Sequence, residues 1–159
     1  MTIVVGAVGV VVAWLLNKFL SQLWAARERS SAVLLRPYIS ADEAQLRSGK
    51  FDIVDGVVKS DPVLTVTASI VQGDKKVTIG YGYAELPNKQ QMGLAICRGT
   101  VKTMEPGGPK SVWQAHMSYA EISQIEQIVF VADGNPEEKW SVSEKDIESV
   151  RKQARSQLR

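Results

Sequence analysis

Leu64-Thr-Val-Thr-Ala-Ser-Ile70 and Val77-Thr-Ile-Gly-Tyr-Gly-Tyr83 show the clearest period of two in this 159-residue chain. Apolar residues alternate with polar residues or glycine in both segments, which is typical of β-strands that bury one face. Gly73-Asp74 lies between the segments and is a tight-turn signal. The pattern therefore predicts an antiparallel β-hairpin. One face of the second strand is expected to carry Val77, Ile79, Tyr81 and Tyr83.

The sequence on either side of this hairpin predicts both strands and helices. Strands are expected at residues 51–58, where Asp55-Gly56 signals a turn, and at residues 113–119 and 128–132. Capping residues, stop signals and apolar residues at helical spacing predict the helices. Helices are expected at residues 25–37, between Ser40 and Gly49, at residues 89–104, around residues 120–126 and after Ser143. The last helix is expected to bury Ile147, Val150, Ala154 and Leu158.

A hairpin followed by mixed elements favours an α+β fold over a regular βαβ arrangement. We expect an N-terminal transmembrane helix and one globular domain with a mostly antiparallel sheet and about three helices. The expected parts are a membrane anchor helix at residues 1–26, a juxtamembrane helical connector at residues 27–50, and an α+β domain at residues 51–159.

The first sixteen residues contain no charge, and their apolar character continues in broken form to Trp24. About twenty mostly apolar residues suffice to span a bilayer. No positive charge precedes the apolar run, which argues against a cleaved secretion signal. The residues expected at the membrane interface are Trp14, Lys18, Trp24, Arg27 and Arg29.

The distribution of positive charge predicts the orientation of this anchor. No Lys or Arg precedes the anchor and every one follows the sixteen uncharged residues, so the positive-inside tendency places the N-terminus outside and the globular domain in the cytoplasm. Gly6, Gly9 and Ala13 share one helix face, where small side chains allow another helix to approach closely. Membrane lipid and either protein partners or a second copy are the expected contacts. A groove of a partner protein would bury the segment equally well.

The composition excludes several kinds of site. One cysteine, Cys97, excludes an intramolecular disulfide, and one histidine, His116, excludes a histidine-rich metal site. Neither a dinucleotide-binding glycine motif nor a phosphate-binding loop is present. We therefore expect no metal, no cofactor and no catalytic residues. A buried, inert Cys97 thiol is favoured over a nucleophile activated by His116.

Two groups of residues suggest binding. Arg151, Lys152, Arg155 and Arg159 lie at a C-terminal end without acidic residues, and could contact nucleic acid or anionic lipid. A net charge of only +2 does not favour nucleic acid, and a solvated helix face explains these cations as well. The aromatic residues could form a stacking platform, but their alternation favours the core. They are Tyr81, Tyr83, Trp113 and Tyr119.

The expected function is that of a single-pass, membrane-anchored, non-catalytic protein-binding or scaffold subunit of a larger membrane-associated assembly. It depends on the anchor and on the lack of a catalytic constellation. The first alternative is a membrane-tethered binder of nucleic acid or anionic lipid through the basic C-terminal helix. The second is a small cysteine-dependent enzyme that uses Cys97 and His116.

Overall fold

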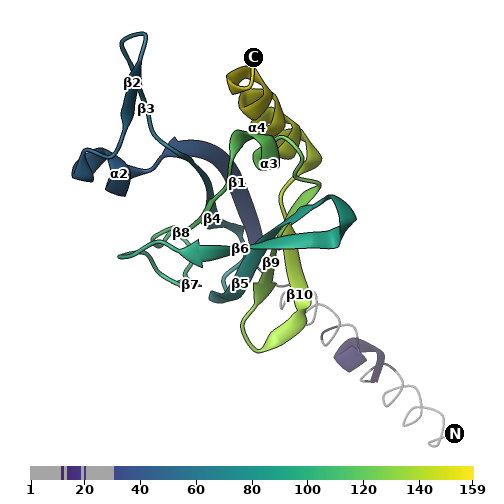
Figure 1. The fold of residues 1–159 in the computed structure, drawn as a ribbon. Coiled ribbons are helices and arrows are strands. Elements are labelled where there is room, and N and C mark those ends of the chain that lie inside the picture. The colour runs from purple at the N-terminus through teal and green to yellow at the C-terminus, as the bar shows by residue number, and fades with distance from the viewer. Residues whose placement is uncertain (1–11, 13, 19, 21–30) are drawn as a thin grey trace, which may run out of the picture. The chain divides into compact units, whose positions relative to one another are not determined.

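The structure is a computed structural model that describes residues 12, 14–18, 20 and 31–159. The chain divides into two units, Met1–Ser30 and Ser31–Arg159, and each is described by itself. The described residues of the first unit are helical. The second unit is mostly a curled antiparallel β-sheet with few helices (Figure 1).

Seven strands of the main sheet form one antiparallel path, and an eighth, β7, pairs with β5 beside it. In order across the sheet, the path consists of β1 (Ala32–Ala41), β4 (Pro62–Gln72), β8 (Ser111–His116), β6 (Gln90–Ile96), β5 (Val77–Leu86), β9 (Gln127–Ala132) and β10 (Asn135–Ser141), with β7 at Thr103–Met104. The outermost strands, β1 and β10, contact each other because the sheet is strongly curled.

Few helices accompany this sheet. The longest is α4 (Glu144–Gln157), and α3 (Tyr119–Ile122) contacts it (Figure 1). Each begins at a serine whose hydroxyl accepts a hydrogen bond from a backbone N–H three residues later. The remaining helical elements are α2 (Glu43–Ser48) and the 3₁₀ turn η1 (Pro87–Lys89).

One hydrophobic core lies between the sheet and α3 and α4. Strand side chains such as Leu64, Val66 and Phe130 are fully buried there, with 0 % exposure. Ile147, Val150 and Ala154 enter the same core from α4, as the sequence predicts. Leu158 does not, because it lies after the end of α4 and is 55 % exposed.

The predicted hairpin is wrong in its pairing, although both of its strands form. β4 lies between β1 and β8, and β5 lies between β6 and β9. The segment between them is tied to the start of β1 instead: the Ser31 hydroxyl donates to the Lys75 carbonyl (2.7 Å) and accepts from its N–H (3.1 Å). Gly73, with φ of +107°, allows this approach, since a Cβ there would lie 2.6 Å from Ser31 Oγ.

The faces of β5 also differ from the expectation. Its pairing with β9 shifts between Ile79 and Tyr81, which marks a bulge. A bulge adds a residue and reverses which side chains point inward. Val77 and Ile79 are therefore buried, but Tyr81 is 54 % exposed and Gly82 is buried in its place.

The helix expected at residues 89–104 is a strand, β6, followed by a loop and β7. Asn88 and Lys89 both have positive φ, so the chain turns sharply just before β6. Within β6, Leu94 is buried and its neighbours at both sides are exposed, which is the period of a strand. The apolar residues of this segment therefore follow a period of two rather than the helical period.

β1 likewise replaces the helix expected up to Pro37, and it occupies part of the expected helical connector, residues 27–50. Pro37 has no backbone N–H to donate to a neighbouring strand. It is tolerated because β1 is an edge strand that pairs with β4 alone, so no second strand needs that N–H. The expected fold class, a transmembrane helix followed by an α+β domain with about three helices, is therefore wrong.

The expected membrane topology is wrong as well. Among the described residues, no helix is long and apolar enough to cross a membrane. This finding contradicts a single-pass protein with its N-terminus outside and its domain in the cytoplasm.

Candidate functional site

Residues 42–61, which we call the arm, leave the sheet between β1 and β4 (Figure 1). The arm contains α2 and a hairpin of β2 (Asp52–Val54) and β3 (Val57–Lys59). Asp55 and Gly56 form its turn with φ of +53° and +77°, the two positive values that a type I′ turn requires. Ile53 and Val54 at the tip are 66 % and 41 % exposed.

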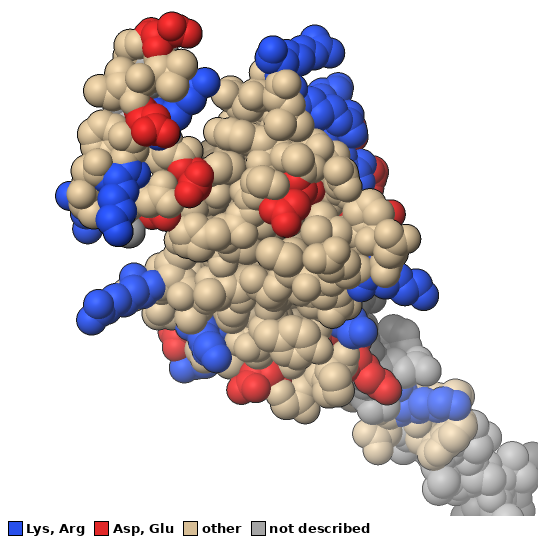
Figure 2. Space-filling view, viewed as in Figure 1, with Lys and Arg blue, Asp and Glu red and all other residues tan. Residues whose placement is uncertain are grey.

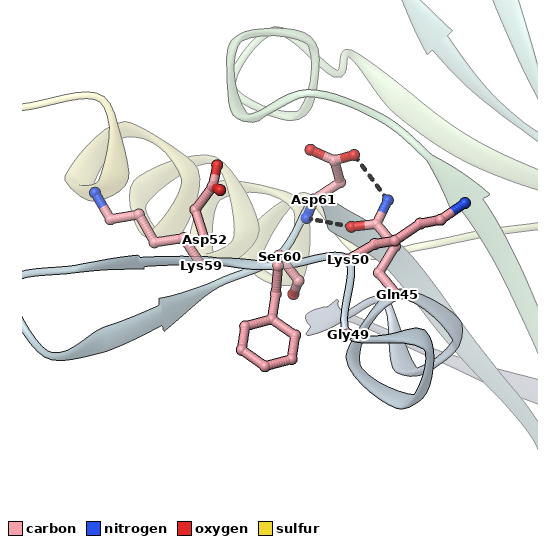
Figure 3. Close-up of a pocket in the computed structure, with 8 residues that line it drawn as sticks. Gln45, Gly49, Lys50, Asp52, Lys59, Ser60 and Asp61 are labelled. Carbon is pink, nitrogen blue, oxygen red and sulfur yellow. Dashed lines mark hydrogen bonds between the residues drawn. The ribbon is translucent and has the colours of Figure 1, made fainter.

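Polar contacts join the two ends of the arm to each other and, through Asp42, to the sheet. Gln45 and Asp61 are joined by two hydrogen bonds: Gln45 Nε2 donates to Asp61 Oδ2 (2.8 Å), and Asp61 N donates to Gln45 Oε1 (3.1 Å) (Figure 3). Asp42 Oδ1 accepts from Gln45 N (3.2 Å), and Asp42 Oδ2 lies 3.5 Å from His116 Nδ1 on β8. These contacts join α2 to the end of the arm next to β4, and one of them reaches β8.

Clefts flank the base of the arm. The helix-side cleft, of about 610 Å³, separates the arm from α3 and the end of α4, and Figure 2 shows a notch between the arm and the rest of the domain. The helix-side cleft is lined by Ile39, Ser40, Ala41, Lys59, Ser60, Asp61, Pro62, Ser118, Tyr119, Ala120, Gln153, Gln157 and Leu158. The hairpin-side cleft, of about 530 Å³, is lined by Gln45, Gly49, Lys50, Phe51, Asp52, Lys59, Ser60 and Asp61 (Figure 3).

The polar groups near these clefts are used to hold the backbone. The Ser118 hydroxyl donates to Glu121 Oε2 (2.8 Å) and accepts from Glu121 N (3.2 Å), which caps α3. A serine in a capping box is not poised as a nucleophile. Among the residues that the structure describes, no cluster of three His, Cys, Asp or Glu side chains could hold a metal ion.

The structure does not bring Cys97 and His116 together. Cys97 N donates to the Val112 carbonyl (2.8 Å), so the cysteine lies beside Val112. His116 follows four residues later on β8, which at about 3.3 Å per residue places it about 13 Å along the strand. Burial raises the pKa of the Cys97 thiol, which is the opposite of activation.

Alkylation of Cys97 should therefore be slower in the folded chain than in the urea-unfolded chain at the same pH. The raised pKa lowers the thiolate fraction, and the thiolate is the reacting form. Mass spectrometry of samples quenched during iodoacetamide treatment at pH 8 gives both rates. A faster reaction in the folded chain would indicate an activated thiolate.

The predicted anion-binding cations are in part engaged inside the domain. Arg151 Nε donates to the Ile125 carbonyl (2.6 Å), and its guanidinium pairs with Glu144 (2.9 Å) and Glu148 (3.2 Å). Arg155 pairs with Glu148 at 3.4 Å. Lys152 and Arg159 are exposed. Half of the expected group therefore lies beside carboxylates rather than on an open basic surface.

Replacing Arg151 with glutamine should lower the free energy of unfolding by about 2 kcal/mol, because charged hydrogen bonds to the fold are lost. Lys152→Gln is the matched control, and should change it by less than about 0.5 kcal/mol. Urea unfolding followed by tryptophan fluorescence measures both variants. Equal stabilities would show that Arg151 is not a structural residue.

The aromatic residues divide between the core and the surface. Trp113 is buried and contacts the Phe130 ring edge-to-face at 5.6 Å, as its expected core position requires. Tyr119 is partly buried and lines the helix-side cleft. Tyr81 and Tyr83 stack at 6.4 Å, and the bulge in β5 turns Tyr81 outward. Sequence periodicity alone does not show that reversal.

The N-terminal candidates lie mostly outside the described residues. This holds for the small-residue face of Gly6, Gly9 and Ala13 and for Trp24, Arg27 and Arg29. Trp14 and Lys18 are described, and Lys18 Nζ lies 4.9 Å from the centre of the Trp14 ring. Their expected place at a membrane interface stays a prediction.

The arm is the feature that the sequence analysis missed as a site. Asp55-Gly56 gives its turn, and the apolar Ile53 and Val54 beside that turn are the available signal. Comparison with known proteins finds no family model that matches the chain, and no curated protein or solved structure with significant similarity to it.

Proposed function

We propose that the sheet domain is a non-catalytic protein-binding module that presents its arm to a partner protein. The observation that supports this function best is an apolar tip on a projecting hairpin. Ile53 is 66 % exposed at the tip, while the base of the arm is held by Gln45 and Asp61. An exposed apolar pair on a preorganised element can be buried in a partner with little ordering cost.

Burying one side chain of the tip in a partner gains a modest free energy, and burying more of the arm gains more. Fully burying an isoleucine or valine side chain contributes about 1.5–3 kcal/mol. Ile53 and Val54 would therefore form the centre of the contact, and the polar residues of the arm would surround it. Figure 2 shows acidic and basic side chains on the arm, as the rim of an interface requires.

Photo-crosslinking from the tip tests this function. A benzoylphenylalanine at position 53 of the full chain should give a discrete adduct with one partner in cells. The same group at position 71 is the control, because Val71 is 60 % exposed on β4 and lies outside the arm. It should not give that adduct.

Binding of the purified partner then provides the quantitative test. Ile53→Asp should weaken the affinity at least tenfold, since a buried aspartate lacks a compensating charge. Val71→Asp should leave the affinity within twofold. Identical adducts from both positions, or an unchanged affinity for Ile53→Asp, would contradict the proposed function.

A further inference from the structure

The chain contains two Asp-Gly pairs, Asp55-Gly56 and Asp133-Gly134, and each lies in a hairpin turn. An aspartate followed by glycine is prone to isomerise, because glycine has no side chain that hinders attack by its own backbone nitrogen. All of these residues are exposed to solvent. A Cβ at Gly56 or Gly134 would meet nothing within 4 Å, so neighbouring atoms obstruct neither pair. The two sites therefore differ in the strands that hold each turn closed.

The turn of the arm has little support from the rest of the fold. Among the described residues, β2 and β3 pair only with each other, through three residue pairs outside the main sheet. The residues of β2 are exposed. A two-stranded hairpin without further support is only marginally stable in water. We therefore expect the turn at Asp55 to open while the rest of the domain stays folded.

The second turn belongs to the main sheet. It joins β9 to β10, and residues 128–132 of β9 are buried. Asp133 N donates to the Thr78 carbonyl on β5 (2.9 Å), so the backbone at Asp133 is tied to the adjacent strand. Opening this turn would disturb strands of the core, which requires far more free energy than opening the arm. Asp133 is therefore the internal control for Asp55.

The reaction itself needs only the chain and water. In an open turn, the Gly56 nitrogen bonds to Cγ of Asp55 and loses its proton while a hydroxyl leaves Cγ, so one water is released and a five-membered imide forms. Water then adds to the imide. Cleavage of the bond between nitrogen and Cγ restores aspartate. Cleavage of the bond between nitrogen and the backbone carbonyl carbon gives isoaspartate, whose main chain runs through Cβ and Cγ. No oxidant or other reactant takes part.

We propose that Asp55 isomerises to isoaspartate without an enzyme, and that this modification ends the binding of the arm to its partner. The second part rests on the proposed function. An additional main-chain carbon does not fit a two-residue turn, so Val54 and Val57 lose their register and the tip no longer presents Ile53 in one place. The carboxylate is retained, so the backbone changes while the charge does not.

Incubation of the full chain at neutral pH, followed by digestion with trypsin, measures both sites in one sample. The two aspartates lie on separate peptides, residues 51–59 and 111–139. Isoaspartate has the same mass as aspartate, so the isomers are separated by chromatography and located by fragmentation. Asp55 should isomerise at least tenfold faster than Asp133 in the folded chain, and at a rate within about threefold of Asp133 in the urea-unfolded chain.

Asp55→Asn and Asp133→Asn repeat this comparison with a product that differs in mass. Asparagine forms the same imide by releasing ammonia, and Asn-Gly also suits a type I′ turn. Deamidation at position 55 should be at least tenfold faster than at position 133 in the folded chains.

Asp55→Gly is the matched variant for binding, because Gly-Gly suits a type I′ turn and cannot form the imide. After the same incubation, the original chain should lose binding of the purified partner in proportion to its isoaspartate content, whereas Asp55→Gly should keep it. The separated isoaspartate form should bind at least tenfold more weakly than fresh protein.

Two results would overturn the inference: equal rates at Asp55 and Asp133 in the folded chain, or an unchanged affinity of the isoaspartate form. Neither result alters the crosslink that fresh protein gives from position 53, so the proposed function would stand. Absence of that crosslink would instead remove the proposed function and, with it, the effect of isoaspartate on binding.

Discussion

Replacing Gly82 with alanine should lower the free energy of unfolding by about 3 kcal/mol, because the added methyl group has no space. A Cβ at this position would lie 2.4 Å from Cε1 of Phe130, its register partner on β9. The Phe130 ring is fully buried and contacts Trp113 at 5.6 Å, so it cannot move aside freely. The structure therefore places an aromatic ring directly against this glycine.

Urea unfolding followed by tryptophan fluorescence measures this loss. Gly93→Ala is the matched control, because Gly93 lies in the neighbouring strand β6 and a Cβ there would meet nothing within 4 Å. That variant should change the free energy of unfolding by less than about 0.5 kcal/mol. Equal losses for the two variants would mean that strand glycine itself, and not the approach of Phe130, sets the effect.

Replacing Phe130 with alanine should cost about 3–5 kcal/mol, since a fully buried aromatic ring is lost and a cavity is left. The same ring occupies the space beside Gly82, so the two changes are coupled. The double variant Gly82→Ala, Phe130→Ala should therefore lose less stability than the sum of the two single variants. The four proteins together form a double-mutant cycle.

Val71→Ala provides the reference for a large residue that the core does not use, since Val71 is 60 % exposed. Its free energy of unfolding should change by less than about 0.5 kcal/mol. If the losses of the double variant were simply additive, the close contact between Gly82 and Phe130 would not exist in solution.

The local elements could be predicted where one physical signal dominated. Alternation identified β4, and Ser143 identified the start of α4 through its capping hydroxyl. The partner of a strand is set by the whole sheet, so the sequence placed β4 beside β5, whereas the structure places it beside β1 and β8. The bulge at Gly80 likewise depends on pairing with β9, and it reversed the face of Tyr81.

The candidate site was harder to predict than the strands. Asp55-Gly56 signals a hairpin turn, but nothing in the sequence shows that Ile53 lacks a covering element. The helix-side cleft joins residues from β1, the arm, α3 and the end of α4. Such a set becomes visible only once the tertiary structure places those elements together.

Amide hydrogen exchange of the full chain, with and without the partner found by crosslinking, tests most directly whether the arm binds that partner. We expect slower exchange in residues 52–59 when the partner is bound. Residues 81–83 of β5, which include the exposed Tyr81 and lie outside the arm, should exchange equally in both states. Protection confined to residues 81–83, with no change in the arm, would contradict this account.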